Sequence, residues 1–171
     1  MSKAAHTLLS RMIIGCSLLL GAPAVFAAPS DSNWQQFLVP DFGTRVEYPA
    51  AIFSVSQGKS EVGTGERLST ADQRASLTIY ARANAAGETP ASYLRNNLRI
   101  PGQVIQYRRV TPFFFAISAE REGLIYYSRC NFSSLRGAAI HCFDLVYPQS
   151  EKRAWDAIVT RISLSLRPLR G

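Results

Sequence analysis

His141 is the only histidine after residue 27, so any catalytic centre that needs an imidazole base has to use it. Ser/His/Asp and Cys/His centres both depend on such a base. His141 lies in a stretch that we expect to be a strand, where successive side chains point to opposite faces. It then points away from both Cys142 and Asp144. We therefore expect a surface or hydrogen-bonded histidine beside a disulfide, not a catalytic base.

Paired carboxylates could carry out glycoside hydrolysis, and Glu120 and Glu122 are spaced to share a strand face. Gly123 follows them directly, so we expect both carboxylates in solvent beside a hairpin turn. The stretch 58–60, Gly-Lys-Ser, resembles the end of a phosphate-binding loop, but no upstream glycine or following helix accompanies it. Zinc would need several histidine or cysteine ligands. The sequence thus predicts no catalytic, cofactor-binding or metal-binding residue.

Two cysteines follow residue 27, Cys130 and Cys142, and we expect them to form a disulfide in an oxidising compartment. Residues 124–132 and 138–147 have the pattern of two strands. A turn centred on Arg136 would place the cysteines opposite each other, where Cα atoms lie about 4.5 to 5.5 Å apart. A redox-active pair is the alternative, but the CxxC spacing typical of that role is absent.

Aromatic and arginine side chains of this hairpin are the candidates for a binding surface, because such residues dominate protein interfaces when they are exposed. They are Tyr126, Tyr127, Arg129 and Tyr147. Two other segments are alternatives. The three phenylalanines at 113–115 point to both faces of one strand, so a helix, a loop or a partner must cover at least one face. The apolar segment 34–40 either lies across the sheet or stays available to a partner.

The first 27 residues have the three parts of a secretory signal peptide. Lys3 and Arg11 precede an apolar run over residues 12–20, and small residues precede a cut that we place after Ala27. The apolar run is shorter than the roughly 20 residues that span a bilayer. In the alternative, a lipoprotein with Cys16 at its N-terminus, the apolar run would continue past the cut. We therefore expect simple cleavage and a periplasmic or secreted protein.

Cleavage would leave 144 residues, which is the length of one ordinary domain. This part has 17 basic and 12 acidic residues, a net charge of +5. Its arginines are scattered along the chain, without the basic tract that nucleic-acid binding requires. We expect no nucleic-acid partner, no cofactor and no membrane span after cleavage.

Two helices and a set of short strands must position these residues. Thr89 and Pro90 are typical of a helix start, and that helix should end near Asn97. Ser150 is expected to be the N-cap of a final helix, whose apolar stripe, which includes Trp155, should pack on a sheet. Strand alternation is expected at 45–48, 53–56, 66–69, 75–81, 103–110 and 113–120, besides the cysteine hairpin.

We expect an N-terminal segment at 28–41, followed by a single α+β domain at 42–168. Its features resemble the Mog1/PsbP-like fold family. The resemblance rests on the run from Val46 to Phe53, the helix start at residues 89–90, the strand that ends at Tyr147-Pro148, and the closing amphipathic helix. It implies a mainly antiparallel β-sheet flanked by a few helices, an α/β/α sandwich. Members of that family are mostly non-catalytic interaction or accessory modules.

Two functions follow as hypotheses. The first is an exported, non-catalytic accessory module that binds a protein or another envelope component through an aromatic and arginine surface. The second is a carboxylate-dependent hydrolase of envelope polymers. A cleft lined by paired carboxylates, or a carboxylate that holds His141, would favour the enzyme. A shallow aromatic surface without such a pair would favour the binding module.

Overall fold

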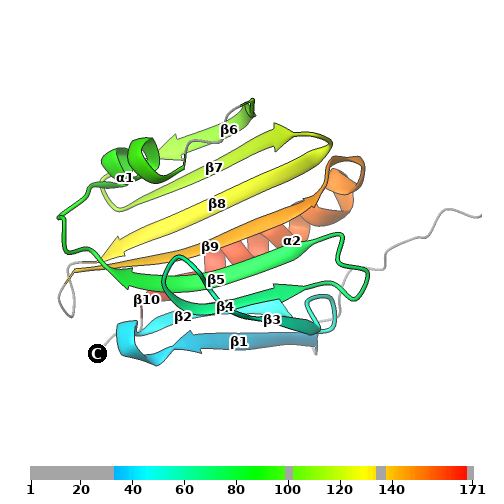
Figure 1. The fold of residues 1–171 in the computed structure, drawn as a ribbon, viewed down its shortest axis with the longest axis horizontal. Helices are drawn as coiled ribbons and strands as arrows, with labels where there is room; N and C mark the ends of the chain where they lie inside the picture. Colours follow the sequence, from blue (N-terminus) through cyan, green and yellow to red (C-terminus); the bar gives the residue numbers. More distant parts are fainter. Residues whose placement is uncertain (1–32, 99–101, 134–137, 169–171) are drawn as a thin grey trace, which may run out of the picture.

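The computed structural model describes residues 33–98, 102–133 and 138–168, and Figure 1 shows how they are arranged. A large sheet has the strand order β3-β4-β5-β9-β8-β7-β6, with all neighbours antiparallel. Its strands are β3 (Val55–Lys59), β4 (Thr64–Ser69), β5 (Ser76–Ala83), β6 (Val104–Val110), β7 (Phe114–Arg121), β8 (Leu124–Ser133) and β9 (Ala139–Pro148). A small sheet has the order β1-β2-β10. Its strands are β1 (Trp34–Val39), β2 (Thr44–Pro49) and β10 (Arg167–Pro168).

Two helices, α1 (Pro90–Asn97) and α2 (Lys152–Ser165), lie on opposite faces of the large sheet (Figure 1). Successive side chains of each strand point to opposite faces of the sheet, and one apolar cluster forms on each face. Tyr80 and Cys142 pack in the cluster that includes α1, whereas their chain neighbours Ile79 and Phe143 pack in the cluster that includes α2. The protein is therefore an α+β sandwich with one helix layer on each face, as the sequence predicts.

The larger apolar core lies between α2 and the large sheet. Trp155, Ile158 and Ile162 recur at helical spacing and are buried in it. The small sheet closes the same core, because Val46 of β2 is fully buried there. Ser165 Oγ also accepts a hydrogen bond from Glu47 N at 2.8 Å, which ties the end of α2 to β2.

α1 begins and ends where the sequence predicts. Thr89 is its N-cap, Pro90 its first residue and Asn97 its last. Thr89 Oγ1 accepts a hydrogen bond from Ser92 N at 3.1 Å, and Thr89 N donates in return to Ser92 Oγ at 2.9 Å. These two bonds form a capping box, which satisfies N–H groups that the first turn cannot pair internally.

The predicted start of α2 is wrong. Gln149–Glu151 form a 3-10 turn, α2 begins at Lys152, and Ser150 makes no capping bond. Pro148 precedes this turn in extended conformation, and the first residues after it stay in the tighter 3-10 geometry. The helix continues through Ser165.

The described part of the predicted N-terminal segment, from residue 33, pairs with the first strand of the predicted domain. β1 pairs along its whole length with β2, from Trp34 opposite Pro49 to Val39 opposite Thr44. Val39 is buried, and Phe37 packs against the larger core. The fold thus includes the apolar segment that we expected to precede it. The predicted signal peptide and Cys16 lie outside the described residues.

The cysteine hairpin has the predicted register. β8 and β9 place Cys130 directly opposite Cys142, with a Cα–Cα distance of 4.2 Å, and a disulfide joins the two residues. The predicted turn around Arg136 lies outside the described residues. Within the part of the chain that the structure describes, no helix has the length and apolar character needed to cross a membrane.

Candidate functional site

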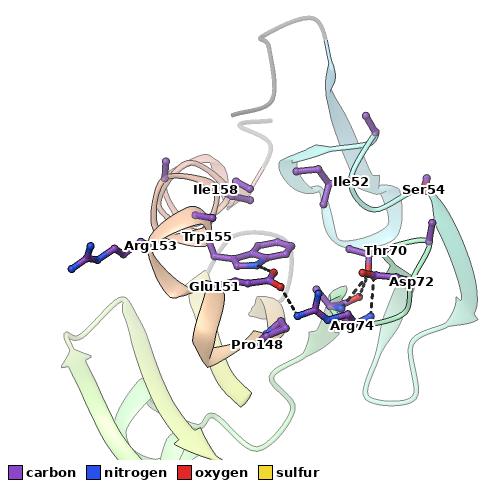
Figure 2. A pocket seen from close by; sticks show the side chains of 15 residues that line it. Ile52, Ser54, Thr70, Asp72, Arg74, Pro148, Glu151, Arg153, Trp155 and Ile158 are labelled. Carbon is purple, nitrogen blue, oxygen red and sulfur yellow. Dashed lines mark hydrogen bonds and ion pairs between the residues drawn. The ribbon is translucent and has the colours of Figure 1, made fainter. Parts of the chain in front are cut away.

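A pocket of about 610 Å³ lies beside the first turns of α2 (Figure 2). We call it the Trp155 pocket. Three segments far apart in the sequence form it: the turn after β2, the turn between β4 and β5, and the start of α2. Its apolar lining includes Ile52, Trp155 and Ile158, and Asp72, Arg74, Glu151 and Arg153 also line it.

The Trp155 ring is held rigidly in the pocket wall. It stacks on Tyr147 of β9, with ring centroids 5.3 Å apart and planes 26° apart, and it contacts Phe53 at 5.8 Å on a tilted axis. Phe53 is placed by a tight turn in which Ile52 N and Phe53 N both donate to Pro49 O. Aromatic rings in such arrays fit few alternative positions, so the pocket is preformed.

Two hydrogen bonds to the Asp72 carboxylate fix the turn between β4 and β5. Thr70 Oγ1 donates to Asp72 Oδ1 at 2.6 Å, and Arg74 N donates to the same oxygen at 3.1 Å. The bond from Thr70 is the main reason why the pKa of Asp72 lies below its ordinary value, and the bond from Arg74 N adds to it. Asp72 therefore stays ionised and is a poor proton donor at neutral pH.

Glu151 connects this turn to α2. Its Oε1 accepts a hydrogen bond from the Arg74 guanidinium, and its Oε2 accepts one from Trp155 Nε1 at 3.3 Å. Figure 2 shows the three side chains side by side at the edge of the pocket. Each carboxylate oxygen of Glu151 thus accepts one hydrogen bond, and the two bonds together orient the carboxylate.

The Trp155 pocket is better suited to binding than to acid–base chemistry. Asp72 and Glu151, its two carboxylates, are committed to hydrogen bonds within the protein. A rigid apolar wall with a few fixed polar groups at its edge is typical of sites that accept an apolar group and orient it.

A second, smaller cavity of about 170 Å³ lies on the opposite face of the large sheet, next to Asp144. Ser128 Oγ donates a hydrogen bond to Asp144 Oδ1, and the Tyr80 hydroxyl also contributes one. Burial raises the pKa of Asp144 to about 6, although both hydrogen bonds act in the opposite direction. No other acidic residue lines this cavity among the described residues.

His141 is buried between the two sheets. Its Nδ1 is 2.7 Å from Thr44 Oγ1 of β2, and burial lowers its pKa. Nε2 has no hydrogen-bond partner among the described residues. His141 lies on the opposite face of β9 from both Cys142 and Asp144, as predicted. A hydroxyl, not a carboxylate, orients the ring, so this residue lacks the partner that a catalytic histidine uses.

Glu120 and Glu122 do not form a site. β7 ends at Arg121, and Glu122 with Gly123 makes the two-residue turn to β8, both at positive φ. Glu122 is exposed and contacts Arg121 Nε at 3.3 Å, whereas Glu120 remains on the strand and accepts a long hydrogen bond from Gln106.

The structure does not bring the four predicted binding residues of the hairpin together. Tyr126 is on the face of β8 opposite to that of Tyr127 and Arg129. Tyr127 and Arg129 both hydrogen-bond to Ser163 of α2, at 2.9 and 3.0 Å. Tyr147 is only 2% exposed, beneath Trp155. The hairpin therefore does not present the single aromatic surface that we expected.

Of the three phenylalanines at 113–115, Phe115 is covered as predicted, because its ring stacks on Tyr93 of α1 at 6.0 Å. Sequence reasoning missed the Trp155 pocket and Asp144. The recurrence of Trp155 and Ile158 was visible, but it indicates only a buried stripe. Within the described ranges, no group of three or more His, Cys, Asp or Glu residues could hold a metal ion.

No family model matches the chain, and no curated protein matches it either. Among solved structures, the chain is similar to the solution structure of cyanobacterial PsbP (CyanoP) from Synechocystis sp. PCC 6803, with a TM-score of 0.59. The two chains are 10% identical in sequence, and the match covers 88% of this chain and 99% of that chain. Similarity at this level of identity is a statement about architecture. We conclude that the chain has the PsbP-like fold.

Proposed function

We propose that the chain is an exported, non-catalytic accessory module that binds an envelope partner protein through the Trp155 pocket. The observation that carries this proposal is a preformed apolar pocket whose rim carboxylates are both engaged within the protein. Export is supported by the signal-like residues 1–27 and by the Cys130–Cys142 disulfide. The resemblance to Mog1/PsbP-like modules supports an accessory role over a catalytic one.

The group that enters the pocket is a large aliphatic or aromatic side chain of the partner. Ile52, Trp155 and Ile158 would bury it, and such buried anchors supply most of the binding energy at protein interfaces. Arg74 and Arg153 at the rim would meet polar groups beside the anchor. The rim then contributes to orientation and specificity more than to affinity.

Selection from a random dodecapeptide library on the oxidised protein tests the proposal. We expect the selected peptides to share one large apolar residue. Ala154 is exposed and lines the pocket, so Ala154→Arg should fill part of it and raise the Kd of a selected peptide at least tenfold. Thr160→Arg is the matched control, because it adds the same charge to α2 at an exposed position outside the pocket. Equal binding to wild type and Ala154→Arg would contradict the proposed site.

A carboxylate-dependent hydrolase of envelope polymers is the second candidate, and Asp144 is the observation that favours it. A carboxyl group with a pKa of about 6 suits a general acid near neutral pH. Glycosidases use a pair of carboxylates, whereas Asp144 is the only acidic side chain on its cavity in the described part of the chain. Release of reducing ends from purified peptidoglycan that stops in Asp144→Asn would establish the enzyme. If no reducing ends are released above the blank, the hydrolase is contradicted and the binding module is the remaining candidate.

A further inference from the structure

β6 is an edge strand of the large sheet, at the top of Figure 1. It pairs with β7 on one side, and no described strand pairs with its other side. Its residues from Val104 to Arg109 are all exposed. Alternate N–H and C=O groups of an edge strand point away from the sheet, so they form a template on which another strand can pair.

Large apolar side chains gather on β6 and on the turn that follows it. The exposed fraction is 61% for Val104, 52% for Ile105, 46% for Tyr107 and 73% for Phe113. These are four of the seven large hydrophobic residues that are exposed among the described residues. Single exposed apolar side chains are common, but a cluster of them along an open strand edge is typical of an interaction surface.

Beside this cluster lie arginines that have no carboxylate partner among the residues that the structure describes. Arg109 and Arg129 both lie over the Phe114 ring, with guanidinium carbons 5.4 and 4.5 Å from its centroid. Arg129 donates to Asn131 Oδ1 at 3.1 Å and to Ser163 Oγ at 3.0 Å, both uncharged acceptors. Burial lowers the pKa of Arg129, and the nearby charge of Arg109 lowers it further.

Within the described ranges, no acidic side chain compensates this positive charge. No ion pair forms at Arg108, Arg109 or Arg129 within the described residues. Two guanidinium groups on one aromatic ring can bind one carboxylate or two adjacent ones, with hydrogen-bond geometry that a lysine pair would lack.

We propose that β6 is a second binding site, which takes an extended acidic segment of a partner protein as an added strand. Main-chain hydrogen bonds to the open edge would hold the segment. Its carboxylates would lie on Arg109 and Arg129, and its apolar side chains would lie against Ile105 on the opposite face of β6. Strand addition of this kind derives affinity from the backbone and specificity from alternate side chains.

A second copy of this chain fits the edge less well. Pairing β6 with itself would bring Arg108 and Arg109 of both copies into one short ladder, and like charges across strands are destabilising. Charged side chains on an edge strand also block self-association in many sheets. The same arginines thus disfavour a second copy and favour an acidic partner.

The test uses synthetic decapeptides that alternate glutamate with valine or tyrosine, titrated into the isotopically labelled, oxidised protein. We expect amide shifts along β6 and β7. A peptide with lysine in place of glutamate should fail to bind. An acidic peptide N-methylated at alternate residues should lose at least tenfold in affinity, because it keeps the charge but cannot pair along the edge.

Matched protein variants separate this site from a general charge effect and from the Trp155 pocket. Arg109→Glu should raise the Kd of the acidic peptide at least tenfold. Arg67→Glu, an equivalent change at an exposed position of β4, should leave the Kd within twofold, and so should Ala154→Arg. Failure at the pocket and failure at β6 are therefore distinguishable.

Several results would overturn the proposal. Equal binding of the N-methylated peptide would show attraction of charge without strand pairing. Binding to phosphatidylglycerol vesicles, with no binding of the acidic peptide, would assign the arginines to a membrane surface. A wild-type dimer in sedimentation that dissociates in Arg109→Glu would assign the edge to a second copy.

Discussion

Asp144 gives the sharpest prediction about the energetics of this fold. Burial raises its pKa from an ordinary value of 3.8 to about 6. A shift of this size corresponds to about 3 kcal/mol by which ionisation of the carboxyl group destabilises the folded state. Asp144 is a half-buried residue beside a cavity, and water there screens part of the charge. We therefore expect Asp144→Asn to raise the free energy of unfolding at pH 8 by about 1–3 kcal/mol.

The sign of this effect depends on pH in a defined way. Below about pH 4 the carboxyl group is protonated in both the folded and the unfolded chain, so Asp144→Asn should change stability little. Between about pH 4 and pH 6 the unfolded chain loses the proton and the folded chain keeps it, so wild-type stability falls. Above pH 6 the difference in the free energy of unfolding between Asp144→Asn and wild type keeps its full value. Asparagine keeps an oxygen that can accept the hydrogen bond from Ser128.

Urea unfolding of oxidised wild type and Asp144→Asn at pH 4 and pH 8 measures the difference in their free energies of unfolding. The contributions of the other titrating groups cancel because both proteins contain them. Asp72→Asn is a control of opposite sign. The hydrogen bonds from Thr70 and Arg74 lower the pKa of Asp72 below its ordinary value of 3.8. This variant should therefore be less stable than wild type at both pH 8 and pH 4, because the loss disappears only as the pH falls through the lowered pKa. A gain in Asp144→Asn that is the same at both pH values, or absent at pH 8, would refute the reasoning.

Three further predictions concern the fold. Replacing Cys130 and Cys142 by alanine opens a loop of about a dozen residues and should lower the free energy of unfolding by about 3 kcal/mol. Chemical denaturation under oxidising conditions measures this loss, and an unchanged unfolding midpoint would contradict it. Thr89→Ala removes the capping bond of α1 and should cost about 1 kcal/mol, measured in the same way, whereas a cost near zero would mean that solvent replaces the cap. Gly65→Ala would place a Cβ atom 2.0 Å from Ile79 O, so we expect no folded protein by circular dichroism, and a native spectrum would show that β4 can move away from β5.

Local signals predicted the elements that depend on neighbouring residues. The hydroxyl and the proline at 89–90 fix the start of α1 within one turn, and the spacing of Cys130 and Cys142 around a short loop sets the register of β8 and β9. The Ser150 cap was wrong because the chain after Pro148 first makes a 3-10 turn, and α2 begins only at Lys152.

The candidate sites depend on contacts between distant segments, which no local pattern specifies. The Trp155 pocket joins residues near 52, 72 and 155. The predicted register of β8 and β9 already places Ser128 opposite Asp144, but it does not specify the burial that raises the pKa of Asp144. Strand alternation alone argues against the predicted hairpin surface. Tyr126 and Tyr127 are adjacent in one strand, so they point to opposite faces of the sheet. Burial of Tyr147 followed from the position of α2, which the sequence did not specify.

The most direct measurement of the central proposal places a photoreactive p-benzoylphenylalanine at Ala154 in cells that export the full chain. If a partner protein occupies the Trp155 pocket, irradiation should give one crosslinked product of discrete mass. The same probe at Thr160, also exposed on α2, should give none, and Ala157→Arg in the pocket lining should abolish the product at Ala154. Equal crosslinking at both positions, or a product that persists when the pocket is filled, would contradict binding through this site.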